Sequence, residues 1–207
     1  MKVLGISGSP RRGKTTDRLV WEVLNACGGE VEFISLAGKN ISPCRACLAC
    51  VKDNICKLRD DMNGLREKLV EADGLVLGAP NYFSMLNGLT HCFLERLGQF
   101  RHRSGRILAD KPAVVLGIGG LQPDLPARQM ETILGYYGIR PIGSVTAQGP
   151  AACFTCGYGE RCEVGAVHML YGPGTTITGD LIPDLSKQPE KLEEARALGK
   201  KLKEEIN

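Results

Sequence analysis

Four cysteines with short, regular spacing are the residues of this sequence best suited to bind a metal cofactor. They are Cys44, Cys47, Cys50 and Cys56. A cubane iron–sulfur cluster needs four thiolates from one wrapped segment. Gaps of two residues let three cysteines point inward from a tight turn, and the longer gap before the last one brings the fourth around. Pro43 precedes the run and disfavours regular structure there. The segment 42–60 is therefore predicted to hold a 4Fe-4S cluster.

A structural zinc ion is the main alternative for these four cysteines. Zinc sites with four cysteines more often use two separated pairs, whereas this run is compact. Ferredoxins use a similar triplet, but there the fourth cysteine of each run binds the other of two clusters. Here the run ends in its own fourth cysteine, Cys56, which favours a single iron–sulfur cluster over zinc.

A second group of cysteines lies in the segment 150–187, which is rich in Gly and Pro. Its members are Cys153, Cys156 and Cys162. Their gaps repeat the last two gaps of the first run, but three thiolates are one short of a four-ligand site. His168, Cys92 or a cysteine of another subunit could complete it. A disulfide or plain packing thiols would also account for the group, so the sequence leaves a second metal site open.

The cysteine count limits the class of protein as well. Nine cysteines, an odd number, argue against a complete disulfide framework. Clustered cysteines in a reducing compartment are more often metal ligands or redox groups. Cys27 and Cys92 lie alone on predicted helix faces, where buried and inert thiols are expected.

The loop after the first predicted strand, residues 7–16, has the composition of a phosphate site. Hydroxyls and backbone N–H groups at the start of a helix bind anions, because the unpaired donors and the helix dipole both face the ligand. Residues 8–15 also match GxxxxGK[ST], the Walker A pattern of P-loop NTPases. An NTPase needs a carboxylate for Mg²⁺ at the end of a neighbouring strand. None of the predicted strand ends, at Ser35, Pro80 and Gly119, supplies one, so the P-loop NTPase is the weaker alternative.

Residues 8–11, Gly-Ser-Pro-Arg, resemble the flavin phosphate loop of the superfamily of NADPH-dependent FMN reductases and iron–sulfur flavoproteins. The compact cysteine run matches the defining motif of the iron–sulfur flavoproteins, and residues 192–202 resemble their closing helix. The resemblance implies two cofactors, FMN and a 4Fe-4S cluster. It also implies that the FMN phosphate is bound by Ser7, Ser9, Arg11, Thr15 and Thr16, of which Thr15 stands where Asn or Ser is usual.

Two further loops are expected to contact the flavin ring. An isoalloxazine has apolar faces and one polar edge, so its pocket needs apolar or aromatic surface together with backbone donors. After the fourth predicted strand, Gly119 and Gly120 would let the backbone approach the ring closely. The loop after the third predicted strand, which resembles the corresponding family segment, supplies Pro80, Asn81, Tyr82, Phe83, Ser84 and Met85.

These loops are positioned by a predicted alternation of strands and helices. Near-continuous apolar strands between amphipathic helices predict a doubly wound parallel sheet, and five strands suit a flavodoxin-like α/β fold. We expect one domain over 1–207, with the cysteine-rich cluster-binding insertion after the second strand. Strands are predicted at 2–7, 30–35, 74–79, 112–118 and about 140–146. Helices are predicted at 15–27, 88–101, about 125–137 and 189–206, and a further helix is predicted to begin at Asp60 or Asp61.

Composition argues against nucleic-acid and membrane partners. The net charge of +3 is too small to indicate nucleic-acid binding, and the basic run 101–103 is expected to be a solvated face. No stretch approaches the ~20 apolar residues of a membrane span. The apolar run at the N-terminus is too short for a signal peptide and lacks a small-residue cleavage site. A cytoplasmic protein is expected.

The resemblance implies a redox protein that passes electrons between the cluster and FMN, with a low-potential donor such as ferredoxin. No catalytic side chain is expected, because the flavin carries the chemistry. Related reductases carry Lys and then Asp-Arg in the helix after the second loop, whereas only Glu95-Arg96 approximates this here, so NAD(P)H remains a possible donor. Family members are dimers or tetramers, and a homodimer or homotetramer is expected. The alternative function is an NAD(P)H-dependent FMN reductase with structural zinc.

Overall fold

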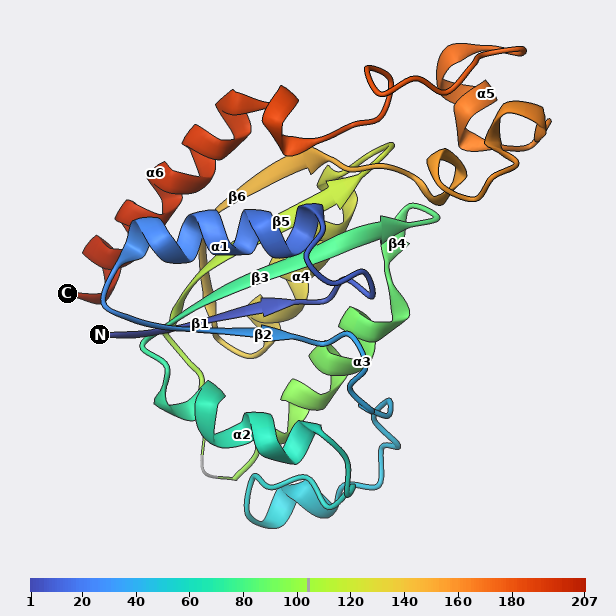
Figure 1. The fold of residues 1–207 in the computed structure, drawn as a ribbon. Helices are drawn as coiled ribbons and strands as arrows, with labels where there is room; N and C mark the ends of the chain where they lie inside the picture. Colours follow the sequence, from blue (N-terminus) through green and yellow to red (C-terminus); the bar gives the residue numbers. More distant parts are fainter. Residues whose placement is uncertain (104) are drawn as a thin grey trace.

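Five parallel strands form the central sheet, in the order β2-β1-β3-β5-β6 (Figure 1). The structure is a computed structural model that describes residues 1–103 and 105–207. This strand order is the flavodoxin-like one, which confirms the predicted fold class. The strands are β1 (Lys2–Ser7), β2 (Glu30–Ser35), β3 (Gly74–Tyr82), β5 (Pro112–Gly119) and β6 (Arg140–Gln148).

Helices cover both faces of this sheet. One face carries α1 (Thr15–Cys27) and α6 (Pro189–Ile206), which pack on each other and on strand residues such as Val3 and Val76. The other face carries α2 (Met62–Glu71), α3 (Gly88–Arg96) and α4 (Asp124–Tyr136). Successive strand residues point to opposite faces, so each strand contributes to both apolar cores.

The structure differs from the sequence predictions at the end of β3. This strand continues past residue 79, turns at Phe83 and Ser84, and returns as the short antiparallel strand β4 (Met85–Leu86). Both turn residues have positive φ, 53° and 64°. A two-residue hairpin turn of this kind usually contains Asn or Gly, so the sequence carried no signal for it.

Two further segments depart from the predicted elements. The predicted helix 88–101 ends at Arg96 and continues as a 3-10 turn, η2 (Leu97–Phe100). The segment 150–187, predicted to be irregular, contains the short helix α5 (Ala166–Tyr171) and the 3-10 turns η3 (Ala152–Phe154), η4 (Gly159–Arg161) and η5 (Leu185–Lys187). These elements are too short to produce a readable period. No helix in the described ranges is both long and apolar enough to cross a membrane.

Candidate functional site

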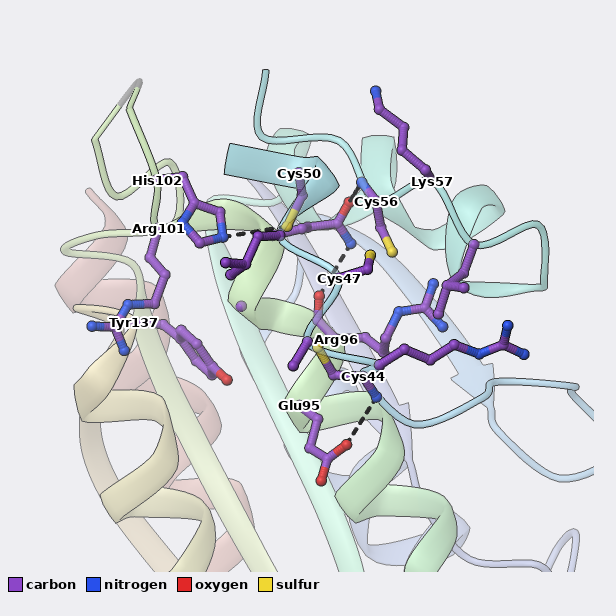
Figure 2. A pocket seen from close by; sticks show the side chains of 16 residues that line it. Cys44, Cys47, Cys50, Cys56, Lys57, Glu95, Arg96, Arg101, His102 and Tyr137 are labelled. Atoms are coloured by element: carbon purple, nitrogen blue, oxygen red, sulfur yellow. Dashed lines mark hydrogen bonds between the residues drawn. The ribbon is translucent and has the colours of Figure 1, made fainter. Parts of the chain in front are cut away.

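The four cysteines of the first run, in the segment between β2 and α2, line one pocket together with the end of α3. The chain there lies beside α2 and α3 (Figure 1), and the pocket holds about 470 Å³. Figure 2 shows the four cysteines around this space, with α3 behind them. All four are free thiols; Cys44 and Cys47 are exposed, whereas Cys50 and Cys56 are half-buried. The structure thus brings together the four residues that the spacing predicted.

Tight left-handed turns wrap the chain around the pocket. Ala46, Leu48 and Asn54, which lie between the cysteines, have positive φ values of 50°, 57° and 56°. This conformation is uncommon for residues other than glycine, and strained backbone tends to cluster at functional sites. A 3-10 turn, η1 (Ala49–Lys52), contains Cys50. The turns agree with the tight wrapping that a thiolate-bound cluster requires.

The end of α3 anchors the first and last cysteine of the run. The backbone N–H of Cys44 donates to Glu95 Oε2 at 2.9 Å, and that of Cys56 donates to Gln99 Oε1 at 3.0 Å (Figure 2). Both anchors fix the backbone and leave the sulfur atoms available. Sequence reasoning assigned no role to Gln99, because the contact joins positions 43 residues apart.

A buried ion pair joins the two ends of the cysteine segment 42–60. Arg96 Nη1 and Nη2 contact the two oxygens of Asp60 at 2.5 and 3.1 Å, and their side chains are only 1% and 3% exposed. Arg96 Nη1 also donates to the carbonyl of Ser42, and Asp60 accepts from the N–H of Ser42. The two ends of the segment 42–60 are therefore held together by one side chain of α3.

This ion pair shifts the pKa of both partners. Burial alone would raise the pKa of Asp60, but hydrogen bonds from Arg96 and from the backbone N–H of Ser42 outweigh it and lower the pKa. Burial likewise opposes the charge of Arg96, and the contact with Asp60 outweighs it and raises the pKa. Both groups stay charged, and the Arg96 guanidinium is engaged by Asp60 and the carbonyl of Ser42.

The chemistry of the pocket fits an anionic thiolate cluster. Burial, and after it the proximity of the other three cysteines, raises the pKa of Cys50. Four thiolates therefore need a bound cation and a positive surround. In the described ranges no three His, Cys, Asp or Glu side chains form a ready-made metal site, so the thiols must close around an incoming group. Exposed positive side chains line the pocket, namely Arg45, Lys57 and Arg101, and outnumber the one acidic side chain of the lining, Glu95.

The basic run 101–103 has a position that the predicted solvated face did not include. Arg101 and Arg103 are exposed, as expected, but Arg101 and His102 also line the cysteine pocket. His102 Nε2 lies 3.3 Å from Cys50 Sγ (Figure 2). The 3-10 turn η2 follows α3 and places residues 101–103 beside the pocket. The number of charges in the sequence does not reveal this position.

The predicted phosphate loop is built around the N-terminus of α1. Ser7, Ser9, Thr15 and Thr16 are buried, although all carry hydroxyls. Ser9 Oγ accepts from the N–H of Arg11 at 3.1 Å, and Arg11 donates to the carbonyl of Pro150. No described side chain caps α1, so its first N–H groups can receive an anion. These residues fit a phosphate.

Three residues that the sequence did not single out support this loop. The carboxylate of Asp17 accepts from the N–H of Gly13 at 2.7 Å. Asn87 Nδ2 donates to the carbonyl of Gly8 at 2.8 Å, and Thr90 packs so closely that a Cβ on Gly8 would lie 1.8 Å from its hydroxyl. The start of α3 is therefore fixed against the phosphate loop, whereas its end holds the cysteines.

The two predicted ring loops meet at the carboxyl ends of β3 and β5. Asn81 Nδ2 donates to the carbonyls of Leu121 and Gln122, and Ser84 Oγ donates to Gln122 Oε1. Gly119 is confined by the loop itself, because an added Cβ would lie 2.6 Å from the Leu121 carbonyl. Gly120 has more room, and Pro80 is buried. Apolar side chains stand exposed around the hairpin turn, namely Tyr82, Phe83 and Met85.

Comparison with known proteins decides the family. Residues 1–152 match the NADPH-dependent FMN reductase family. The chain is 32% identical to an iron–sulfur flavoprotein of Methanocaldococcus jannaschii over 100% of its own length and 97% of that protein. This chain belongs to the iron–sulfur flavoproteins of the FMN reductase family. Membership supports a flavin oxidoreductase that uses FMN.

Solved structures of flavoproteins share the fold. RosB with a bound 8-demethyl-8-formylriboflavin-5′-phosphate intermediate superposes with a TM-score of 0.70 at 17% identity, over 100% of this chain and 79% of that one. A flavodoxin from the domain Archaea gives 0.56 at 11% identity, over 100% and 99%. The match to the FMN reductase family covers the cysteine run, the phosphate loop and both ring loops of this iron–sulfur flavoprotein. It ends before Cys153.

Proposed function

We propose that this flavoprotein transfers electrons between a 4Fe-4S cluster on Cys44, Cys47, Cys50 and Cys56 and FMN bound beyond the carboxyl ends of the strands. When bound, the cluster supplies single electrons and the flavin exchanges one or two. The chain thus converts between one-electron and two-electron chemistry.

The arrangement of the cysteine pocket is the observation that carries the proposal. Four cysteines line one pocket, the backbone of the first and last is fixed by Glu95 and Gln99, and a buried ion pair closes the segment. A buried ion pair costs desolvation free energy and is weak evidence for stability alone. Its position at both ends of the segment favours a role in shaping this site.

The residues of the chain have distinct tasks in this function. Ser7, Ser9, Thr15 and Thr16 present buried hydroxyls to the FMN phosphate, and Arg11 adds a positive charge at the loop. The two ring loops, which Asn81 and Ser84 hold together, provide apolar surface and backbone donors. The positive side chains that line the cysteine pocket favour a cluster of negative net charge.

The electron donor follows from the same reasoning. A low-potential one-electron donor such as ferredoxin suits the cluster, which accepts single electrons. Glu95 and Arg96 are the two residues that approximate the Asp-Arg of related reductases, and Arg96 is buried against Asp60. This position disfavours NAD(P)H as the donor.

A second function keeps some support. An NAD(P)H-dependent FMN reductase with zinc on the same cysteines agrees with the description of the matched family. Four cysteines are also a common zinc ligand set. A P-loop NTPase has less support, because β2 and β3, the strands on either side of β1, end at Ser35 and Tyr82, which carry no carboxylate.

An absorbance spectrum of protein purified without oxygen tests these functions. Flavin bands with a broad shoulder at about 400 nm, together with acid-labile sulfide, are expected for the proposed function. Flavin bands with no sulfide, and with zinc that the double variant Cys44→Ser, Cys47→Ser loses, would instead establish the zinc reductase. Released ATP or ADP, with no flavin after reconstitution, would contradict both.

A further inference from the structure

The second cysteine group lies apart from the first in the structure. Cys153, Cys156 and Cys162 are in the segment after β6, which Figure 1 shows at the opposite side of the molecule from the cysteine segment 42–60. Cys92, which the sequence offered as a fourth ligand, packs on the core under α2, α3 and α4. A site at the second group must therefore be completed from within its own segment or by another subunit.

Backbone N–H groups already point at two of the three sulfur atoms. The N–H of Tyr158 donates to Cys156 Sγ at 3.4 Å, and that of Ala166 donates to Cys153 Sγ at 3.3 Å. Hydrogen bonds from the backbone stabilise a thiolate, and such bonds around metal ligands tune and orient them. The Cys156 thiol in turn donates to the carbonyl oxygen of Cys153 at 3.5 Å, so Cys153 and Cys156 are joined within one turn of the backbone.

Glycines fit the backbone closely around the same cysteines. Gly157, directly after Cys156, has a φ of 81°, which lets the chain turn so that the next N–H meets the sulfur. A Cβ on Gly159 would lie 2.1 Å from the carbonyl oxygen of Cys153. The turn from Cys153 to Gly159 is thus built for close approach.

A backbone carbonyl fixes the tautomer of His168 within the same segment. Its Nε2 lies 2.9 Å from the carbonyl oxygen of Glu160. A carbonyl oxygen can only accept, so Nε2 carries the proton and Nδ1 of the neutral ring keeps its lone pair. Histidine ligands of metals commonly donate their other ring N–H to a backbone carbonyl in this way.

The segment has little apolar core of its own. Between residues 150 and 187, the buried apolar side chains are Phe154, Val167 and Leu185. Its helix α5 has six residues, and its 3-10 turns have three each. Segments with so little buried surface are commonly stabilised by a structural metal or a disulfide.

We infer that Cys153, Cys156, Cys162 and His168 form a second metal site, which binds one Zn²⁺ in a Cys3His set. This set is common for structural zinc, whereas 4Fe-4S clusters use four cysteines. On binding, the three thiols release their protons to solvent and the neutral imidazole binds through Nδ1. The described side chains do not form a ready-made site, so binding closes the segment around the ion and couples to its folding.

Metal analysis of the intact protein tests the site. Protein prepared without oxygen should hold one zinc per chain in addition to about four irons. The double variant Cys153→Ser, Cys156→Ser should lose the zinc and keep iron, sulfide and FMN. The reciprocal double variant Cys44→Ser, Cys47→Ser should lose iron and keep the zinc, which separates this site from the proposed cluster.

Three results would overturn the inference. The first is that the variant Cys153→Ser, Cys156→Ser retains its zinc. The second is that this variant loses about four irons, which would indicate a second cluster. The third is a Cys153–Cys156 disulfide in protein that binds no zinc after reduction. If the double variant does not fold, Co²⁺ added to the reduced variant Cys44→Ser, Cys47→Ser serves instead. Thiolate-to-cobalt charge-transfer bands at one Co²⁺ per chain, removed by an equivalent of Zn²⁺, are expected, and their absence would also overturn it.

The histidine ligand is tested separately. His168→Ala should weaken zinc binding, and His168→Cys should restore it, because four cysteines are also a zinc ligand set. His91→Ala is the matched control, since His91 lies on α3 and pairs with Glu95. Unchanged zinc affinity in His168→Ala would remove His168 from the site.

Discussion

At the scale of single residues, the cysteine run and the phosphate loop use different side chains and are expected to fail independently. Cys47→Ser should lose most of the about four irons and four sulfides per chain, because the cluster needs all four thiolates. FMN content should not change. Cys92→Ser, a half-buried cysteine outside the pocket, is the control. Iron, sulfide and flavin assays decide the outcome, and full iron content in Cys47→Ser would contradict the ligand assignment.

The phosphate loop gives a complementary prediction. Ser9→Asp should weaken FMN binding at least about tenfold, or about 1.4 kcal/mol, because it puts a carboxylate beside the phosphate. Lys14→Gln should have little effect, since the Lys14 side chain is exposed. Titration of the apoprotein with FMN measures both. The opposite order, with Lys14 essential and Ser9 tolerant, would point to the Walker A interpretation.

Site residues that lie close together in the sequence were predicted far better than contacts between residues that lie far apart in the sequence. The cysteines and the hydroxyls of the first loop are recognisable because their spacing is local. Asn87, Thr90 and Gln99 were missed, since each supports a residue more than 40 positions away. The place of His102 beside Cys50 likewise depends on how α3 ends.

At the scale of elements, α3 is the part that connects the two sites. Its start touches the phosphate loop through Asn87 and Thr90, and its end holds the cysteine segment through Glu95 and Arg96. The helix has nine residues, so it is about 13 Å long. Movement of the cysteine segment is therefore expected to be transmitted to the flavin site through this helix.

The ion pair at the end of α3 yields a stability prediction. Arg96→Met should lower the free energy of unfolding by about 3–5 kcal/mol, because it leaves the Asp60 carboxylate buried without its partner. Urea unfolding measures this loss. Arg140→Ala, which breaks an exposed pair with Glu205, should cost less than about 1 kcal/mol. Similar losses in the two variants would show that the buried pair has no special role.

The same pair predicts how the apoprotein responds to acid. The pKa of Asp60 lies below its ordinary value of 3.8 in the folded protein, so the unfolded chain binds more protons at low pH. The stabilisation is complete above that ordinary value and is lost as the pH falls through the lowered pKa. The protection factors for amide hydrogen exchange over residues 42–60, which correct for the pH dependence of the intrinsic exchange rate, should fall in that range, and those of Asp60→Asn should already be low at neutral pH. High, pH-independent protection factors in both proteins would contradict this.

Among the elements, those with a clear period were predictable. Most strands and long helices matched, because buried faces impose a period on the sequence. The hairpin at Phe83 and Ser84 was not, since its turn uses residues that rarely adopt positive φ. Helix α5 was missed because its six residues span fewer than two turns.

At the scale of the whole molecule, the cysteine pocket lies at one end of α3 and the phosphate loop at the other. The cysteine pocket and the hairpin between β3 and β4 are open to solvent in a single chain, as the exposed Cys44, Cys47 and Phe83 show. An assembly that covers them would protect both cofactors and shorten the path between the cluster of one subunit and the flavin of another. We therefore expect a homodimer or homotetramer.

A mixing experiment tests this arrangement directly. Cys47→Ser should keep FMN without the cluster, and Ser9→Asp should keep the cluster with little FMN, so neither alone should show rapid flavin reduction by a low-potential one-electron donor. After dissociation and reassembly together, mixed oligomers pair an intact cluster with an intact flavin across a subunit boundary. Flavin reduction should then recover, up to the fraction of mixed pairs measured by native mass spectrometry. Mixed oligomers without recovery, or a wild-type monomer with full activity, would place electron transfer within one chain along α3.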